Sequence, residues 1–303
     1  MLSRRHFVLL AFAAALTVTP TLAQDKAQEK FKVVATFSIL DDLVKNVGGD
    51  RVEATALVGP NSDAHVFSPT PADAKTLAAA KLVIVNGLGY EGWMTRLVKA
   101  SGAKAPAVVA SAGIKSRKMA DDHHPGQMVT DPHAWQSVAN AKLYVANIRE
   151  ALSKADPAGK NAYEANAKSY LAKLDELEQE VKAAIEKIPA GHRRIITTHD
   201  AFGYFGGAYG MEFVSPEGVS TEAQPSAKDV ARIIAQIKKQ KIPAVFMENI
   251  TDPRLMQQIA KETGAKVGGT LYSDALSDAK GPAATYIDMM RSNIRELSKA
   301  LAP

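Results

Sequence analysis

Apolar side chains between positions 157 and 188 recur at alternating spacings of about three and four residues, the period of an α-helix with one buried face. These positions are Tyr163, Ala167, Tyr170, Leu174, Leu177, Val181, Ala184 or Ile185, and Ile188. Asp156 suits the N-cap and Pro157 the first turn. Pro189 and Gly191 are typical of a helix end. The pattern predicts one helix of about 30 residues, roughly 45 Å long at 1.5 Å per residue.

The same apolar stripe would also suit the seam of a coiled-coil dimer. However, the repeat lasts only about four heptads, and strand and helix patterns alternate on both sides of it. We therefore interpret residues 157–188 as a linking helix between two lobes of one chain, and we expect a monomer.

Short apolar runs alternate with amphipathic stretches before and after this helix. The predicted strands are 31–37, 51–58, 82–86, 106–109, 194–198, 212–215, 244–247 and 266–272. The predicted helices besides 157–188 are 39–47, 71–80, 91–100, 137–154, one ending at 209, 226–239, 253–263 and 282–301. Such alternation is typical of βαβ units. We predict an α/β fold of two lobes, 31–155 and 190–303, each with a parallel sheet flanked by helices.

The alternation lapses between Gly113 and Trp135. This polar segment contains Asp121-Asp122-His123-His124, and loops of such length in a compact domain are usually functional or disordered. Its two histidines are candidate metal-binding groups. A solvated loop without a role is the alternative.

Residues 1–23 have the pattern of a cleavable secretory signal peptide: a basic start, an apolar core from Phe7 to Val18, and small residues at Thr21-Leu22-Ala23. Arg4 and Arg5 suit a twin-arginine signal, and an ordinary signal needs a positive start as well, so the pattern leaves Sec and Tat export open. The chain has no cysteine, which excludes disulfides, thiolate metal sites and a cysteine-linked lipid anchor. The sequence predicts a periplasmic protein.

The formal net charge of +5 is small and dispersed, so we expect no binding to nucleic acid. Chemistry is instead suggested by polar residues that follow predicted strands. His65, His199 and Asp274 each lie just beyond a strand, and the carboxyl ends of parallel strands line the ligand crevice of an open sheet. His133 precedes a helix start that can face the same crevice. Imidazole and carboxylate donors suit a divalent metal ion, held by two residues from each lobe.

Five motifs, in order along the chain, resemble those of the cluster A-I substrate-binding proteins of metal ABC transporters. They are Gly59-Pro60-Asn61-Ser62-Asp63-Ala64-His65, Asn86-Gly87-Leu88-Gly89-Tyr90-Glu91-Gly92-Trp93, Asp131-Pro132-His133-Ala134-Trp135, Thr198-His199-Asp200-Ala201-Phe202-Gly203-Tyr204-Phe205 and Tyr272-Ser273-Asp274. The resemblance covers about 31–301 and implies two α/β lobes joined by one long helix. It also implies that His65, His133, His199 and Asp274 are the metal ligands, and that the chain is not an enzyme.

The third ligand position discriminates between cargoes in this family. Manganese- and iron-oriented members usually have glutamate there and zinc-oriented members histidine, so His199 indicates Zn²⁺ as the transported ligand, with Mn²⁺ or iron as the alternative. We expect the protein to deliver its ion to an inner-membrane ABC permease. A zinc hydrolase is disfavoured because four protein donors leave no open position for water. An adhesin is disfavoured by the lack of an anchoring cysteine. Zinc-oriented members often carry a long histidine-rich insertion before the second ligand, so the resemblance implies that His123 and His124 form either a scavenger that passes zinc inward or the docking site of a periplasmic metallochaperone.

Residues next to the candidate ligands allow further predictions. Asp131 and Asp200 each adjoin a candidate histidine and are candidate acceptors that fix its tautomer. Asp63 is explained at least as well by turn chemistry as by metal ligation. His192 is expected at the surface, and Phe205 in the core.

Overall fold

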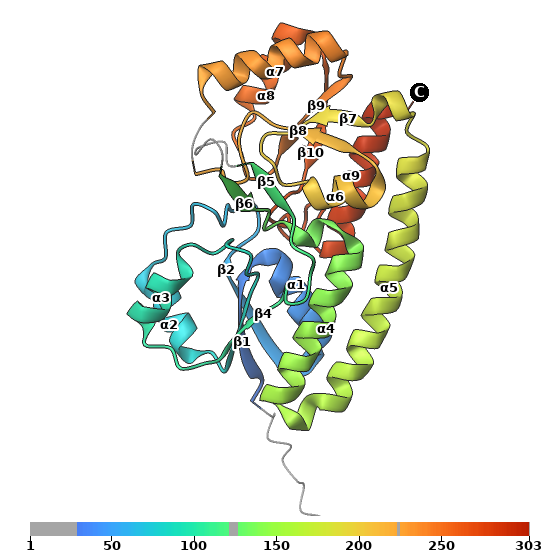
Figure 1. Ribbon diagram of the computed structural model, residues 1–303. Coiled ribbons are helices and arrows are strands. Elements are labelled where there is room, and N and C mark those ends of the chain that lie inside the picture. Colours follow the sequence, from blue (N-terminus) through green and yellow to red (C-terminus); the bar gives the residue numbers. More distant parts are fainter. Residues whose placement is uncertain (1–28, 121–126, 223–224, 303) are drawn as a thin grey trace, which may run out of the picture.

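The computed structural model of the protein describes residues 29–120, 127–222 and 225–302 (Figure 1). The predicted signal peptide, with Arg4 and Arg5, lies outside the described residues, as does the pair His123 and His124. Within the described residues, no helix combines the length and apolarity that a membrane span requires.

The first lobe is built on a parallel sheet with the order β2-β1-β3-β4. Its strands are β1 (Phe31–Phe37), β2 (Val52–Val58), β3 (Leu82–Val85) and β4 (Ala107–Val109). Its helices are α1 (Ser38–Gly48), α2 (Pro71–Ala79), α3 (Met94–Ser101) and α4 (Val138–Ala155). The central strand β1 is buried from Val33 to Phe37, because helices cover both faces of a parallel sheet.

The second lobe repeats this architecture with the strand order β10-β9-β7-β8, again parallel (Figure 1). Its strands are β7 (Arg194–Ile196), β8 (Glu212–Val214), β9 (Ala244–Glu248) and β10 (Lys266–Leu271). Its helices are α6 (Gly203–Tyr209), α7 (Ala227–Gln240), α8 (Arg254–Thr263) and α9 (Tyr286–Leu301). The predicted two-lobe α/β fold is confirmed. The lobe limits given above as residue numbers stay a prediction.

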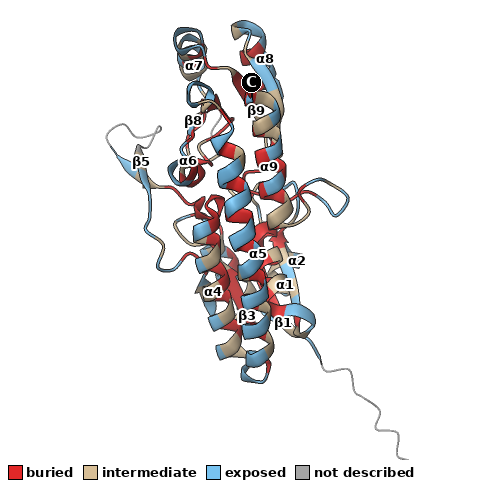
Figure 2. Ribbon diagram, turned by 90° about the vertical axis from the view of Figure 1, so that its right-hand side faces the viewer, coloured by how far each residue is buried: buried red, intermediate tan, exposed pale blue. Residues whose placement is uncertain are grey.

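The long helix α5 (Lys160–Glu186) follows both lobes from one end of the molecule to the other (Figure 1). It begins three residues later than predicted, because Pro157–Gly159 form a 3-10 turn. Most of the predicted apolar stripe is buried, and it packs on α4, α1 and α9 (Figure 2). The stripe is therefore covered within one chain, as expected of a linking helix.

Two differences from the predicted elements have local causes. The polar segment after β4 contains a short antiparallel pair, β5 (Lys118–Ala120) and β6 (Met128–Thr130), whose three-residue strands are too short to show a period. Helix α9 begins at Tyr286 rather than at 282, because the Thr285 side chain caps it by accepting a hydrogen bond from Asp288 N.

The start of α9 ties the second half of the chain to the first. The backbone N–H of Tyr286 donates to Oδ2 of Asp42 on α1, at 2.9 Å, and its hydroxyl donates to the carbonyl of Trp135, at 2.7 Å. The backbone N–H of Leu276 donates to Ser38 Oγ at 3.0 Å. These bonds hold the segment after β10, which carries Asp274, against the first lobe.

Candidate metal centre

The four predicted ligand residues meet between the lobes. His65 follows β2, His133 follows β6, His199 follows β7 and Asp274 follows β10. One potential ligand atom from each residue lies within 4.8 Å of those of the other three. The side chains of His133, His199 and Asp274 are fully buried, and that of His65 is 6% exposed. The fold thus brings together two candidate donors from each lobe, and an ion would reach them past His65.

The spacing of these atoms suits a small ion with four ligands. Oδ2 of Asp274 lies 3.1 Å from Nε2 of His65, 3.2 Å from that of His199 and 3.5 Å from that of His133. The Nε2 atoms of His65 and His133 are 3.2 Å apart. In a tetrahedron with bonds of about 2.0–2.1 Å, which zinc makes to imidazole and carboxylate, the ligands are about 3.3–3.4 Å apart. Four of the six distances between the donor atoms therefore approach those of a tetrahedral site, and the other two are at most 4.8 Å.

A carboxylate orients His133 from behind. Oδ1 of Asp131 accepts the backbone N–H of His133 at 3.0 Å and faces its Nδ1 at 2.9 Å. Arg117 pairs with the other oxygen of Asp131 at 3.3 Å. With Nδ1–H donating to Asp131, the lone pair of Nε2 is free to bind a metal ion. The predicted contact between Asp131 and His133 is confirmed.

The partner of His199 is a residue that the sequence did not suggest. Oε1 of Glu248, at the end of β9, accepts the backbone N–H groups of Thr198 and His199, and Oε2 lies 2.6 Å from Nδ1 of His199. This second contact is an ion pair rather than a well-aligned hydrogen bond. Asp200, which was predicted for this role, instead accepts a hydrogen bond from Ser215 at 2.7 Å. The signal available in the sequence was an acidic residue, Glu248, at the carboxyl end of β9, the strand that pairs with β7.

Several residues next to the candidate ligands hold the loops that carry them. Oδ1 of Asp63 accepts the backbone N–H of His65 at 2.8 Å, so Asp63 is a turn residue and not one of the four grouped side chains. The Trp93 indole donates to Ala64 O at 2.8 Å, which fixes the same loop. His65 packs edge-on against Tyr90, with ring centroids 4.7 Å apart. His192 is exposed and Phe205 is buried, as predicted.

The buried charges set the protonation of the site. Burial alone would lower the pKa of His133, but the charge of Asp274 and the hydrogen bond to Asp131 raise it to about 9. The pKa of His199 is also raised, since Glu248 and Asp274 outweigh burial. Burial lowers the pKa of His65. Without an ion, two imidazolium groups therefore flank the Asp274 carboxylate at neutral pH.

Ion binding is consequently expected to release about two protons near pH 7, because a metal binds neutral imidazole. Competition from the His133 proton ends only as the pH rises through about 9, the pKa of His133. Below that pH each released proton changes the dissociation constant tenfold per pH unit. We expect affinity to rise by about 10- to 100-fold per unit between pH 6 and 8. Calorimetric titration in buffers of different ionisation enthalpy measures the proton count, and a count of zero would contradict this protonation scheme.

Comparison with known proteins identifies the family. The family model described as ZnuA, zinc-uptake complex component A, periplasmic, matches residues 33–300 of this chain. The chain belongs to the ZnuA family. The resemblance inferred from the five motifs is confirmed, and the chain is a metal-binding substrate-binding protein of an ABC transporter. Members of the ZnuA family work with a membrane permease and are not enzymes. The predictions of a membrane permease as partner and of a protein that is not an enzyme are therefore confirmed.

Relatives in the ZnuA family carry the names of different metals. The iron-binding protein YfeA of Yersinia pestis is 34% identical over 97% of this chain and 94% of its own length. The manganese ABC transporter substrate-binding lipoprotein PsaA of Streptococcus pneumoniae is 30% identical over 97% and 96%. The structure of the periplasmic zinc binding protein TroA from Treponema pallidum superimposes with a TM-score of 0.84, at 31% identity, over 90% of this chain and 100% of that one.

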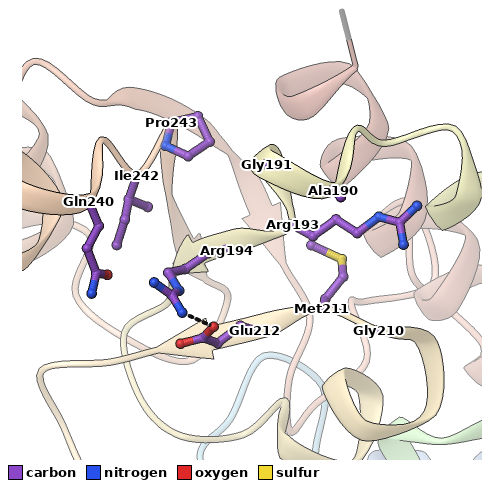
Figure 3. A pocket seen from close by; sticks show the side chains of 10 residues that line it. All are labelled: Ala190, Gly191, Arg193, Arg194, Gly210, Met211, Glu212, Gln240, Ile242 and Pro243. Carbon is purple, nitrogen blue, oxygen red and sulfur yellow. Dashed lines mark hydrogen bonds and ion pairs between the residues drawn. The ribbon is translucent and has the colours of Figure 1, made fainter.

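A hollow of about 490 Å³ lies at the edge of the second lobe's sheet where β7 and β8 begin, whereas the candidate ligands follow the ends of the strands (Figure 3). Its arginines are already engaged. Arg193 donates to the carbonyls of Ile188 and Glu186 at the end of α5, and Arg194 pairs with Glu212. The hollow is therefore separate from the metal centre and holds no free cationic group to which an anion would be drawn.

Proposed function

We propose that the protein captures Zn²⁺ in the periplasm, with His65, His133, His199 and Asp274 as the ligands, and delivers it to an ABC permease for import. The observation that carries this proposal is that three imidazole nitrogens and one carboxylate oxygen lie within 4.8 Å of one another, with Oδ2 of Asp274 3.1–3.5 Å from all three nitrogens. Nitrogen donors favour a metal later in the stability order than Mn²⁺ or Fe²⁺. The absence of cysteine from the sequence supports a protein free in the periplasm. A monomeric state and metallochaperone docking at His123 and His124 remain predictions.

Manganese is the second candidate cargo, and one feature of the site favours it. Oδ1 of Asp274 is buried and has no hydrogen-bond partner among the described residues. A bidentate Asp274 would raise the coordination number to five, beyond the tetrahedral number that zinc prefers. The names of YfeA and PsaA add support for iron or manganese in the family.

The two cargoes are distinguished by the ratio of the dissociation constants for Mn²⁺ and Zn²⁺. Zn²⁺ binds more tightly than Mn²⁺ to almost any site with nitrogen and oxygen donors. The decisive measurement is therefore the change in this ratio when a ligand residue is substituted. Replacing His199 with Glu exchanges nitrogen for oxygen, and we expect the Mn²⁺/Zn²⁺ ratio of dissociation constants to fall by about tenfold or more. Elemental analysis after competitive loading with both metals, together with titration of each, measures this.

His192→Glu provides the matched control, because it makes the same replacement at an exposed histidine of the same lobe. We expect it to leave the ratio unchanged. Preferential loading of manganese by the unmodified protein would overturn the zinc assignment. Failure of both ions to bind would overturn the site itself.

A further inference from the structure

A hollow of about 430 Å³ lies beside the metal centre, between the two lobes. The loop before the first candidate ligand contributes Asp63, and Val66 follows that ligand. The second lobe contributes Glu217 and Thr221 from the loop after β8, and Asp252 from the segment between β9 and α8. Asp63, Glu217 and Asp252 are acidic, and Arg254, which pairs with Asp252, is the one basic residue of the wall, so the hollow attracts cations.

Glu217 is the unusual member of this group. The residue is only 5% exposed, and its carboxylate has no hydrogen bond or ion pair among the described residues. Its backbone N–H donates to Thr198 O at 3.3 Å, which places it next to the segment that carries His199. Burial raises the pKa of Glu217 to about 7, opposed by His199 and reinforced by Glu248 and Asp63. A buried carboxylate without a partner is costly, and a cation in the hollow would remove that cost.

Asp63 brings a second carboxylate to the same hollow and links it to the first ligand. One of its oxygens accepts the backbone N–H of His65 at 2.8 Å. The other accepts the hydroxyl of Thr221, in the opposite lobe, at 2.5 Å. Two carboxylates, a hydroxyl and water are donors that a hydrated divalent cation accepts readily.

We propose that Asp63 and Glu217 form a transient cation-binding position, through which the divalent ion enters and leaves the site of the four candidate ligands. This inference rests on the proposed function, in which those ligands hold the transported ion. His65 is the one residue of the four whose side chain is not fully buried, at 6% exposed, and Val66, directly after it, lines the hollow. An ion that exchanges water for carboxylate oxygens here approaches the site already partly dehydrated.

A larger hollow of about 730 Å³ is lined by His65 itself and is the rival route. Its wall includes Phe67, Tyr90 and Trp93, and Arg96 adds a positive charge. Its one acidic residue, Glu222, is balanced by Arg96, so this wall attracts a hydrated dication less strongly than the smaller hollow does. The smaller hollow has three carboxylates against the single guanidinium of Arg254.

The proposal is tested by the kinetics of Zn²⁺ and Mn²⁺ binding to the Glu217→Gln variant, measured by stopped flow. A transient position on the entry path of the ion changes the activation barrier to binding and release, but not the free energy of the bound state. We expect the association and dissociation rate constants to fall together by about tenfold, with the dissociation constant unchanged within about twofold. Folding should be retained, since glutamine removes an unpaired buried charge while keeping the shape.

Asp252→Asn is the matched control, because it removes one charge from the rim of the same hollow at an exposed residue that is already paired with Arg254. We expect it to slow association much less than Glu217→Gln. If the two variants slowed association equally, Glu217 would contribute only to the general attraction of cations, and the proposal would be overturned. A weaker equilibrium affinity of Glu217→Gln with an unchanged association rate constant would also overturn it.

Magnesium competition tests the unmodified protein without any substitution. Mg²⁺ accepts carboxylate and water oxygens but not a site rich in imidazole. Millimolar Mg²⁺ should slow Zn²⁺ association more than a sodium salt of equal ionic strength does, and the excess should disappear in Glu217→Gln. An identical effect of the two salts would overturn the transient position. If neither Zn²⁺ nor Mn²⁺ binds at equilibrium, the proposed function fails instead.

Discussion

The Asp274→Ala variant is expected to bind divalent cations at least about a thousandfold more weakly than the unmodified protein, a loss of about 4 kcal/mol. Asp274 supplies the one anionic donor, and its Oδ2 lies within 3.5 Å of Nε2 of all three histidines. Removing it leaves three neutral donors and no charge to balance the cation. Titration with Zn²⁺ and Mn²⁺ measures the loss.

The same variant should also change how stability depends on pH in the absence of metal. His133 has its pKa raised from 6.5 to about 9 in the folded protein, so its contribution is fully present below about pH 6.5 and is lost as the pH rises through 9. The full shift corresponds to up to about 3 kcal/mol, and Asp274 causes part of it. We expect the stability difference between variant and wild type to be larger at pH 6 than at pH 9.5, by urea unfolding with a chelator present.

Asp278→Asn controls for the loss of a carboxylate from the same segment, because Asp278 is exposed. It should leave both binding and the pH profile unchanged. Asp274→Asn separates charge from shape and is expected to behave like the alanine variant. Affinity within about tenfold of wild type in both Asp274 variants would show that the ion is held elsewhere.

The Glu248→Gln variant is expected to lose about 10- to 100-fold in metal affinity, although Glu248 is not among the four grouped donors. Glutamine keeps an acceptor for the backbone N–H groups of Thr198 and His199 but loses the charge that faces His199 Nδ1 at 2.6 Å. The imidazole then becomes a weaker electron donor to the metal and is less firmly oriented. Titration calorimetry measures the affinity, and NMR titration of the metal-free variant should show a lower pKa for His199.

Glu262→Gln makes the same change at an exposed residue of the same lobe and should leave affinity unchanged. An affinity loss in Glu248→Gln without a change in the pKa of His199 would mean that Glu248 acts through the backbone of its loop alone. Unchanged affinity would remove it from the site altogether.

The sequence predicted the features whose signal is local. The 3.6-residue period of α5 survives for many turns, and residues such as Leu174 and Val181 on that stripe are fully buried. The role of Asp131 was predictable because Asp131 stands two residues from the histidine that it orients. Five motifs in order located the four candidate ligands, since each motif lies in one continuous loop.

The features that the sequence did not reveal depend on which strands become neighbours. Glu248 reaches His199 because β9 pairs with β7, with Val245 opposite Ile196, and no local pattern fixes that register. The acidic hollow likewise joins Asp63 to Glu217 and Thr221 across the lobes. Partners that are distant along the chain become visible only once the two sheets are assembled.

The position of α9 has a consequence for how the chain folds during synthesis. The last helix packs against α5 and α1, and Tyr286 at its start bonds to Asp42 and Trp135. Until these final residues have left the ribosome, part of the apolar stripe of α5 remains exposed to water. The packing of the amino-terminal lobe is therefore completed only by the carboxyl-terminal helix. A truncated chain would expose an apolar helix face that chaperones bind, and its first half would not fold separately.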